Sequence, residues 1–292
     1  MKKGIPRVSP HKEKGFGIEV LSFAQLFEKL EKTKKYSPFF FHKLEFYLIL
    51  IVKEGCYRHF VDFESYSLEG GSALFVAENQ VQHFTDDLLK SDGISIIFDN
   101  SYLDRSYIFS GCNNFYSLFN YPIGTSAIHE GEIEPTDFID IAQKMYEEYS
   151  FPDSHTKTEI LNSLLKVLLL KAERIKKIRA ELNTNVKCLE IFMSFKNLIE
   201  KEYILSRSSR YYAEKLLISY KSLNEIVKKI TNKTTKVFID DFVMMEIKRY
   251  LKFTSLSIKE ISYKTGFDES TNLVNFFKKN AGITPANFRK QF

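Results

Sequence analysis

A helix-turn-helix pattern near the C-terminus restricts the fold of this chain more than any other feature. Segment Ser257–Glu260 has the form of a capping box, in which the Ser257 hydroxyl accepts from the Glu260 amide and the Glu260 carboxylate accepts in return from the Ser257 amide. Gly266 is expected to end this helix, because a residue without a Cβ adopts the left-handed conformation at low cost. Phe267 follows directly and is expected to plug the turn.

The helix predicted after this turn has two chemically different faces. It begins near Asp268 to Ser270, runs to about Asn280 and ends at Gly282, and Thr284-Pro285 then starts a short last helix. The inward face is apolar and consists of Leu273, Phe276 and Phe277. The outward face carries hydrogen-bonding residues followed by cations, which is the chemistry needed to contact base edges and then phosphates: Thr271, Asn272, Asn275, Lys278 and Lys279.

A looser copy of the same pattern lies upstream. A first helix packs through Tyr212, Ala213 and Leu216, Ile218 plugs the turn, and Ser219 caps a second helix. The inward residues of that second helix are Leu223, Ile226, Val227 and Ile230. Its outward residues are Tyr220, Lys221, Asn224, Glu225, Lys228 and Lys229.

One long helical stretch, Lys236–Phe253, separates the two copies. At 1.5 Å per residue it spans about 27 Å, and successive major-groove faces on one side of B-DNA recur about every 34 Å. This match favours two recognition helices held in adjacent groove segments by a rigid spacer.

The distribution of charge agrees with a nucleic-acid partner. Residues 185–292 contain 20 Lys and Arg against 11 Asp and Glu, a net charge of +9, whereas the residues before them carry −4. A basic segment beside an acidic one favours contact with a polyanion. An ordinary solvated surface is the alternative explanation for the same charges.

The C-terminal residues resemble the AraC/XylS family of bacterial regulators. The resemblance covers roughly Cys188–Phe292 and implies a seven-helix DNA-binding domain. Carried over by position, the first recognition helix presents Tyr220, Lys221, Asn224 and Glu225, and the second presents Ser270, Thr271, Asn272 and Asn275. The resemblance rests on Tyr212–Leu216, Ile218-Ser219, Ser257–Ile261, Gly266-Phe267, Phe277–Lys279, Gly282–Pro285 and Phe288-Arg289.

The chain departs from the family pattern at several positions. Leu217 stands where the family often has glycine, and a left-handed residue with a Cβ costs about 1 kcal/mol or more. Ser262 replaces the usual alanine. Glu225 and Asn275 stand where several members carry arginine, and Glu225 cannot bind phosphate but can accept from cytosine N4. These departures leave the fold expectation intact and leave the target sequence open.

Short apolar runs separated by turn residues predict a small barrel or sandwich in the first part of the chain. Phe46–Lys53 is predicted as a buried strand, with Tyr57–Glu64 as its partner across Glu54-Gly55. Turns are expected at Gly70-Gly71 and Asp92-Gly93. Further strands are predicted at Ala73–Val76, Val81–Phe84 and Ile94–Phe98. These segments resemble the cupin-like barrel that many AraC/XylS members place before the DNA domain.

Helices are predicted on both sides of the strands. Ser22–Lys32 is expected to form a helix capped by Ser22, and a second helix begins near Thr136 and ends at Phe151–Asp153. A third runs over about Thr156–Ile178 with one apolar side. That side either pairs with a second copy of the chain or covers the barrel, and the residues leave both readings open.

The expected architecture is therefore α+β, with an N-terminal cupin-like β-barrel with flanking helices and a C-terminal all-α domain with two helix-turn-helix units. The expected divisions are 1–130 for the regulatory domain, 131–184 for helical dimerisation and linker residues, and 185–292 for the DNA-binding domain.

No catalytic or metal site is expected from the residues. His42, His59 and His83 are separate and form no HxH pair, so each is interpreted as a polar core or surface residue rather than a ligand. Cys56 and Cys188, with Cys112, are far apart and suggest free thiols in a reducing compartment. No cofactor is expected, and a cupin enzyme stays a remote alternative.

The function expected from these features is a sequence-specific DNA-binding transcription regulator, with double-stranded DNA as its partner. A small-molecule sensor, in which the barrel binds an effector and the DNA domain is the output, is the main alternative, and the effector site is unknown. A homodimer is a further open expectation. The basic, Gly- and Pro-broken segment Met1–Phe16 does not resemble a secretory signal, and the apolar run Phe46–Val52 is too short to span a bilayer, so a cytoplasmic protein without a membrane partner is expected.

Overall fold

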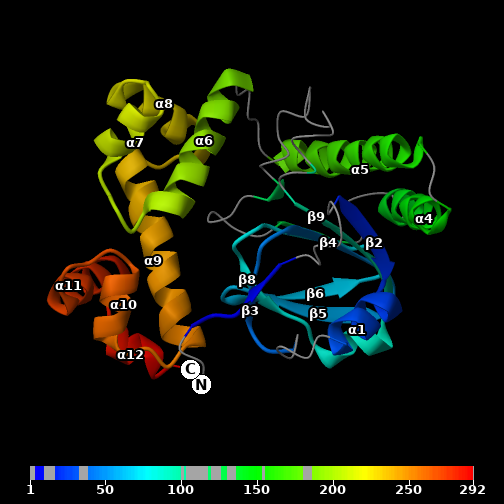
Figure 1. Cartoon of the computed structure of the whole chain (residues 1–292), viewed down its shortest axis with the longest axis horizontal. Coiled ribbons are helices and arrows are strands. Elements are labelled where there is room, and N and C mark those ends of the chain that lie inside the picture. The colour runs from blue at the N-terminus through cyan, green and yellow to red at the C-terminus, as the bar shows by residue number, and fades with distance from the viewer. Residues whose placement is uncertain are drawn as a thin grey trace. The chain divides into compact units, whose positions relative to one another are not determined.

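The computed structural model describes residues 4–9, 17–32, 39–99, 102, 118–119, 126–129, 136–152, 155–179 and 186–291 (Figure 1). The chain divides into two compact units, Pro6–Glu181 and a second unit of Leu182–Phe292 together with Met1–Ile5. The first unit contains the strands and the second is helical, which is the α+β division expected. Among the described residues, no helix combines the length and the apolar character needed to cross a membrane.

The first unit contains two five-stranded sheets. All the pairings are antiparallel except the parallel pair of β1 and β3. Backbone pairing between the described strands does not join the two sheets into one closed barrel. One sheet has the order β1 (Arg7–Val8), β3 (His42–Leu44), β8 (Val81–His83), β5 (Cys56–Val61) and β6 (Glu64–Glu69). The other has the order β10 (Ser126–Ile128), β7 (Ala73–Val76), β4 (Tyr47–Glu54), β9 (Asp92–Phe98) and β2 (Ile18–Ser22).

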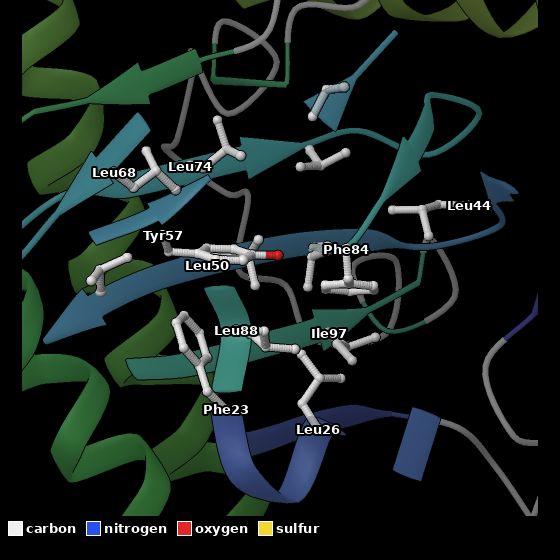
Figure 2. Packing of buried hydrophobic residues seen from close by; sticks show 14 of the residues in the cluster. Phe23, Leu26, Leu44, Leu50, Tyr57, Leu68, Leu74, Phe84, Leu88 and Ile97 are labelled. Carbon is white, nitrogen blue, oxygen red and sulfur yellow. The ribbon is translucent and has the colours of Figure 1, made fainter. Parts of the chain in front are cut away.

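The core of this unit lies between the sheets, and Figure 2 shows its side chains converging from both. Strand β4 is buried from Tyr47 to Val52, because alternate residues of a strand point to opposite faces and both faces are covered. Leu48, Leu50 and Val52 belong to the core cluster. Helix α1 (Phe23–Glu31) adds Phe23 and Leu26, and the 3-10 helix η1 (Asp86–Lys90) adds Leu88.

The predicted hairpin between Phe46–Lys53 and Tyr57–Glu64 is wrong. Strand β4 pairs with β7 and β9, whereas β5 pairs with β6 and β8 in the other sheet. Gly55 has φ of +87°, and together with a register shift between Val52 and Glu54 it turns the chain from one sheet into the other. The hairpin partner of β5 is β6, which the sequence analysis did not predict.

The turn predicted at Asp92-Gly93 is also wrong, because both residues lie within β9. Gly93 is required there for packing, since an added Cβ would overlap the backbone oxygen of Ile51 and the ring of Phe23. The turn at Gly70-Gly71 is confirmed between β6 and β7, and Gly71 has φ of +90°.

The predicted helices of the first unit are confirmed. Ser22 caps α1 with a complete capping box to Gln25. Helix α4 (Thr136–Ser150) contacts β2, β4 and β9, and α5 (Lys157–Arg179) packs on α4. The expected role of Thr136 as a cap rests on a side chain outside the described residues. The predicted apolar stripes are buried in both helices through Phe138, Ile141, Ala142, Met145, Leu161, Leu165, Leu168, Ala172 and Ile175.

The second unit contains seven helices over its described residues, as the resemblance implied. They are α6 (Val186–Glu202), α7 (Ser209–Lys215), α8 (Tyr220–Thr231), α9 (Thr235–Phe253), α10 (Ile258–Lys264), α11 (Ser270–Ala281) and α12 (Pro285–Arg289). Phe195, Tyr212 and Phe238 bring α6, α7 and α9 into one aromatic core.

Candidate nucleic-acid interface

The first helix-turn-helix unit consists of α7 and α8. The turn between them carries Leu217, a non-glycine residue with φ of +56° whose side chain is 92% exposed. The amide of Ile218 donates to the Ala213 carbonyl at 3.1 Å and closes the turn. Ser219 then caps α8 by accepting from the Ser222 amide at 3.0 Å. The turn therefore adopts the predicted left-handed geometry despite the absence of glycine.

Helix α8 buries one face and exposes the other. Leu223, Ile226 and Val227 are buried, as predicted. Among the residues predicted to contact DNA, Tyr220, Lys221, Glu225 and Lys228 are exposed. In the part of the chain that the structure describes, these four side chains have no hydrogen-bond or ion-pair partner.

Asn224 is the exception on α8. Its side chain is half-buried, and its Oδ1 accepts a hydrogen bond from the Thr235 amide at 3.0 Å. Thr235 is the first residue of α9. Asn224 thus attaches the recognition helix to the start of the spacer helix, and its oxygen already accepts one hydrogen bond from the protein.

The second unit consists of α10 and α11, and its predicted local features are present. Ser257 and Glu260 form the capping box, with Glu260 N donating to Ser257 Oγ at 3.2 Å and Ser257 N donating to Glu260 Oε2 at 2.8 Å. Phe267 plugs the turn and is buried. Ser262, which replaces the family's alanine, is buried, and its hydroxyl donates to the Lys259 carbonyl at 2.7 Å. That bond satisfies the extra polar atom within its own helix.

Gly266 occupies the left-handed position of this second turn with φ of +75°. A Cβ there would overlap the backbone carbonyl of Ile204, in the segment between α6 and α7. Glycine is therefore required at this position by close approach as well as by backbone conformation.

Helix α11 exposes the side predicted to contact DNA. Thr271, Asn272 and Asn275 are exposed, and within the described residues their side chains make no hydrogen bond to the protein. Lys278 and Lys279 are exposed near its C-terminal end. Ser270, the first residue of the helix, is half-buried. Leu273 and Phe277 are buried as predicted.

Helix α9 connects the two units. It has 19 residues, which corresponds to about 28 Å. Figure 1 shows α7 and α8 near one end of α9 and α10 and α11 near the other. At the far end, the Arg289 guanidinium donates to the carbonyls of Leu251 and Leu256 at 3.2 and 2.6 Å, which ties α12 to the end of the spacer.

Two of the three histidines considered above, His42 and His59, are buried and hydrogen-bonded, whereas His83 is half-buried. Gln82 Nε2 lies 2.5 Å from His42 Nε2, and the Tyr57 hydroxyl lies 2.8 Å from His59 Nδ1. Burial lowers the pKa of His42 to about 4 and that of His59 to about 3. Within the described residues, no group of three His, Cys, Asp or Glu side chains is placed to hold a metal ion.

Comparison with known proteins places the C-terminal region in a family. A family model described as a helix-turn-helix domain matches residues 212–291. The HTH-type transcriptional activator RhaS from Escherichia coli O1:K1 / APEC is 20% identical over 254 residues, which is 85% of this chain and 87% of that protein. RhaS from Escherichia coli strain SMS-3-5 / SECEC matches with the same values.

Solved structures of similar proteins include ToxT from Vibrio cholerae, with 16% identity and a TM-score of 0.42 over 94% of this chain and 98% of that one. The C-terminal domain of the response regulator yesN from Fusobacterium nucleatum is 28% identical, with a TM-score of 0.31 over 32% of this chain and 93% of that one. Residues 212–291 form a helix-turn-helix domain of the AraC type, and the protein is a DNA-binding transcription regulator.

Proposed function

We propose that α8 and α11 enter two successive major-groove segments on one side of duplex DNA. The observation that carries this proposal is the pair of exposed polar faces near the two ends of one 19-residue helix, whose side chains, apart from Asn224, have no hydrogen-bond or ion-pair partner among the described residues. The proposed contacts are made by Tyr220, Lys221, Asn224, Glu225, Lys228, Ser270, Thr271, Asn272, Asn275, Lys278 and Lys279.

The lysines at the C-terminal ends of the two helices are assigned to the phosphate backbone. Lys228 and Lys278 lie in the last turns of α8 and α11, beyond the residues proposed to face base edges. Contacts to phosphates orient a protein on the duplex without reading sequence, and they release counterions. Binding is therefore expected to weaken steeply as the salt concentration rises.

The test is fluorescence anisotropy of the full chain on DNA from its own upstream region and on DNA of scrambled sequence, at several salt concentrations. Lys278→Ala should weaken binding to both DNAs alike and reduce the salt slope by about one. Asn272→Ala should reduce the preference for the upstream DNA and leave the salt slope unchanged. An absence of salt-sensitive binding would refute the proposed DNA contact, and identical behaviour of the two variants would refute the assignment of roles.

Control by the first unit is the second part of the proposal. An effector that binds this unit preferentially in its folded state raises its thermal stability by mass action. Thermal unfolding of the full chain against a panel of sugars and apolar acids would therefore identify an effector. Figure 2 shows the core side chains of this unit converging between the sheets. A small-molecule sensor is the second candidate function.

A homodimer formed through α4 and α5 is proposed from an exposed apolar surface. Phe151, Ile160, Val167 and Leu170 are exposed, and Phe151 and Ile160 line a groove of about 370 Å³. Sedimentation equilibrium should show a dimer that Ile160→Ser with Val167→Ser weakens, whereas Ser163→Ala on the same helix leaves it intact. An unaltered monomer in all three proteins would contradict the proposal.

The last part of the proposal concerns where the protein acts and whether it is an enzyme. The relatives named above are transcription regulators, and a DNA partner supports a role in the cytoplasm without catalytic activity.

A further inference from the structure

The two recognition helices are copies of one another with a constant spacing of 50 positions. Each has 12 residues, and each ends in a left-handed residue, Asn232 or Gly282. A threonine then caps the next helix in both copies, Thr234 and Thr284. Leu223 corresponds to Leu273 and Val227 to Phe277, and all four are buried. Equivalent positions of α8 and α11 therefore hold equivalent places on their helices.

The C-terminal halves of the two copies carry the same exposed charges. Lys228 corresponds to Lys278 and Lys229 to Lys279, and all four side chains are exposed. Since lysine contacts phosphates as a point charge, these positions make the same sequence-independent contact in both copies.

The N-terminal halves differ in the chemistry that they expose. At the sixth position of each helix, α8 has Glu225 and α11 has Asn275, and both side chains are exposed without a protein partner in the described structure. At the second position, α8 has Lys221 and α11 has Thr271. A carboxylate only accepts hydrogen bonds, whereas an amide both donates and accepts.

This difference determines which base edge each helix fits in the major groove. Adenine presents an acceptor at N7 and a donor at N6, which the two ends of one amide group match. Cytosine presents the N4 donor, which a carboxylate matches. The asparagine on α8, Asn224, is half-buried, and its Oδ1 already accepts a hydrogen bond from the Thr235 amide, which holds its amide group toward α9.

We propose that the protein recognises an asymmetric DNA site, with adenine read by Asn275 of α11 and cytosine read by Glu225 of α8, about one turn of duplex apart. This inference rests on the proposed function, because it requires both helices to lie in the major groove. The proposed phosphate contacts are equal in the two halves, so the difference in base preference arises in the N-terminal halves of the helices, where the second and sixth positions differ.

The experiment is selection of bound sequences from a randomised duplex library by the full chain and by exchange variants. Glu225→Asn should change the selected base from cytosine to adenine at one position. Asn275→Glu should change adenine to cytosine at a second position, about one turn away. Each exchange should shift the ratio of affinities for the two bases by roughly 5- to 150-fold. Lys228→Ala and Lys278→Ala are the matched controls and should lower affinity without changing the selected bases.

The possible outcomes distinguish a failure of the proposed function from a failure of the base assignment alone. If the chain and its lysine variants show no salt-sensitive binding, the proposed function itself fails. If salt-sensitive binding is present but Glu225→Asn and Asn275→Glu select the same sequences as the original protein, only the base assignment fails. Because both residues are exposed, the thermal unfolding temperature of each variant should match that of the original chain. If one variant is less stable, Glu225→Gln replaces Glu225→Asn, or Asn275→Asp replaces Asn275→Glu.

Discussion

The guanidinium of Arg207 lies over the ring of Phe267, with Cζ 3.8 Å from the ring centroid, and 5.7 Å from the centroid of Phe276. Arg207 belongs to the segment between α6 and α7, and Phe267 belongs to the turn between α10 and α11. The neighbouring Ile204 carbonyl approaches Gly266 closely in the same region. The two helix-turn-helix units are therefore connected by a second contact in addition to α9, and this contact restricts how α8 and α11 rotate relative to one another.

Replacing Arg207 should loosen this connection. Arg207→Ala removes a partly buried cation–π contact and should lower the free energy of unfolding by about 1 kcal/mol. It should also weaken binding to a duplex that spans both groove segments more than binding to a short duplex that offers one. Arg210→Ala, at an exposed position of α7, is the matched control. Equal effects of the two substitutions in urea unfolding and anisotropy would contradict the role given to Arg207.

Leu217 is strained and exposed, so its replacement by glycine should stabilise the protein. A left-handed residue with a Cβ costs about 1–2 kcal/mol, and the added flexibility of glycine in the unfolded chain offsets part of that gain. Leu217→Gly should therefore raise the free energy of unfolding by up to about 1 kcal/mol, as measured by urea unfolding of the full chain. Leu217→Ala keeps the Cβ and should give no gain. A loss of stability in Leu217→Gly would show that the leucine side chain contributes contacts that outweigh the strain.

The features that were predicted correctly depend on residues that lie close together in the sequence. The cap at Ser22, the capping box at Ser257 and the plug at Phe267 each involve residues within a few positions of one another, so propensity and spacing are sufficient to find them. The buried faces of α8 and α11 follow from helical periodicity alone. The exposure of Thr271 and Asn275 follows from the same periodicity.

The features that were missed depend on contacts between distant segments. The pairing of β4 with β9 instead of β5 depends on the direction in which Gly55 turns the chain, and both pairings satisfy the same apolar pattern. Gly93 looked like a turn residue, although it is required where Phe23 packs on the sheet. Neither the contact of Arg207 with Phe267 nor the bond from Thr235 to Asn224 has a local sequence signal. The first adds Arg207 to the residues that orient the DNA-binding helices, and the second holds the Asn224 side chain against the start of α9.

Gly266 and Gly282 offer a matched test of the packing between the two helix-turn-helix units. Their φ values are +75° and +74°, but a Cβ overlaps the Ile204 backbone at Gly266 and meets nothing within 4 Å at Gly282. Gly282→Ala should lower the free energy of unfolding by about 1 kcal/mol, which is the cost of the left-handed conformation. Gly266→Ala should cost more, by about 1–3 kcal/mol, because small-to-large changes in packed sites force backbone shifts. Equal losses in urea unfolding would refute the close approach of Ile204.

The buried histidines His42 and His59 should make the first unit sensitive to acid. Burial lowers the pKa of His42 to about 4 and that of His59 to about 3, against an ordinary value of 6.5. The nearby His83 lowers both pKa values further. The unfolded chain therefore takes up protons below pH 6.5 that the folded chain does not bind until pH falls to about 4 or lower.

Stability contributed by the neutral histidines is consequently full above pH 6.5 and should fall as pH drops toward 4, by about 1.4 kcal/mol per pH unit for each histidine. Proton NMR of the full chain should show two histidine resonances that do not titrate between pH 8 and 5. Urea unfolding over the same range should show a smaller pH slope in His42→Asn, whereas His155→Ala, which alters an exposed histidine, should leave the slope unchanged. If all the histidine resonances titrated near pH 6.5, burial would not hold the rings of His42 and His59 in their neutral form.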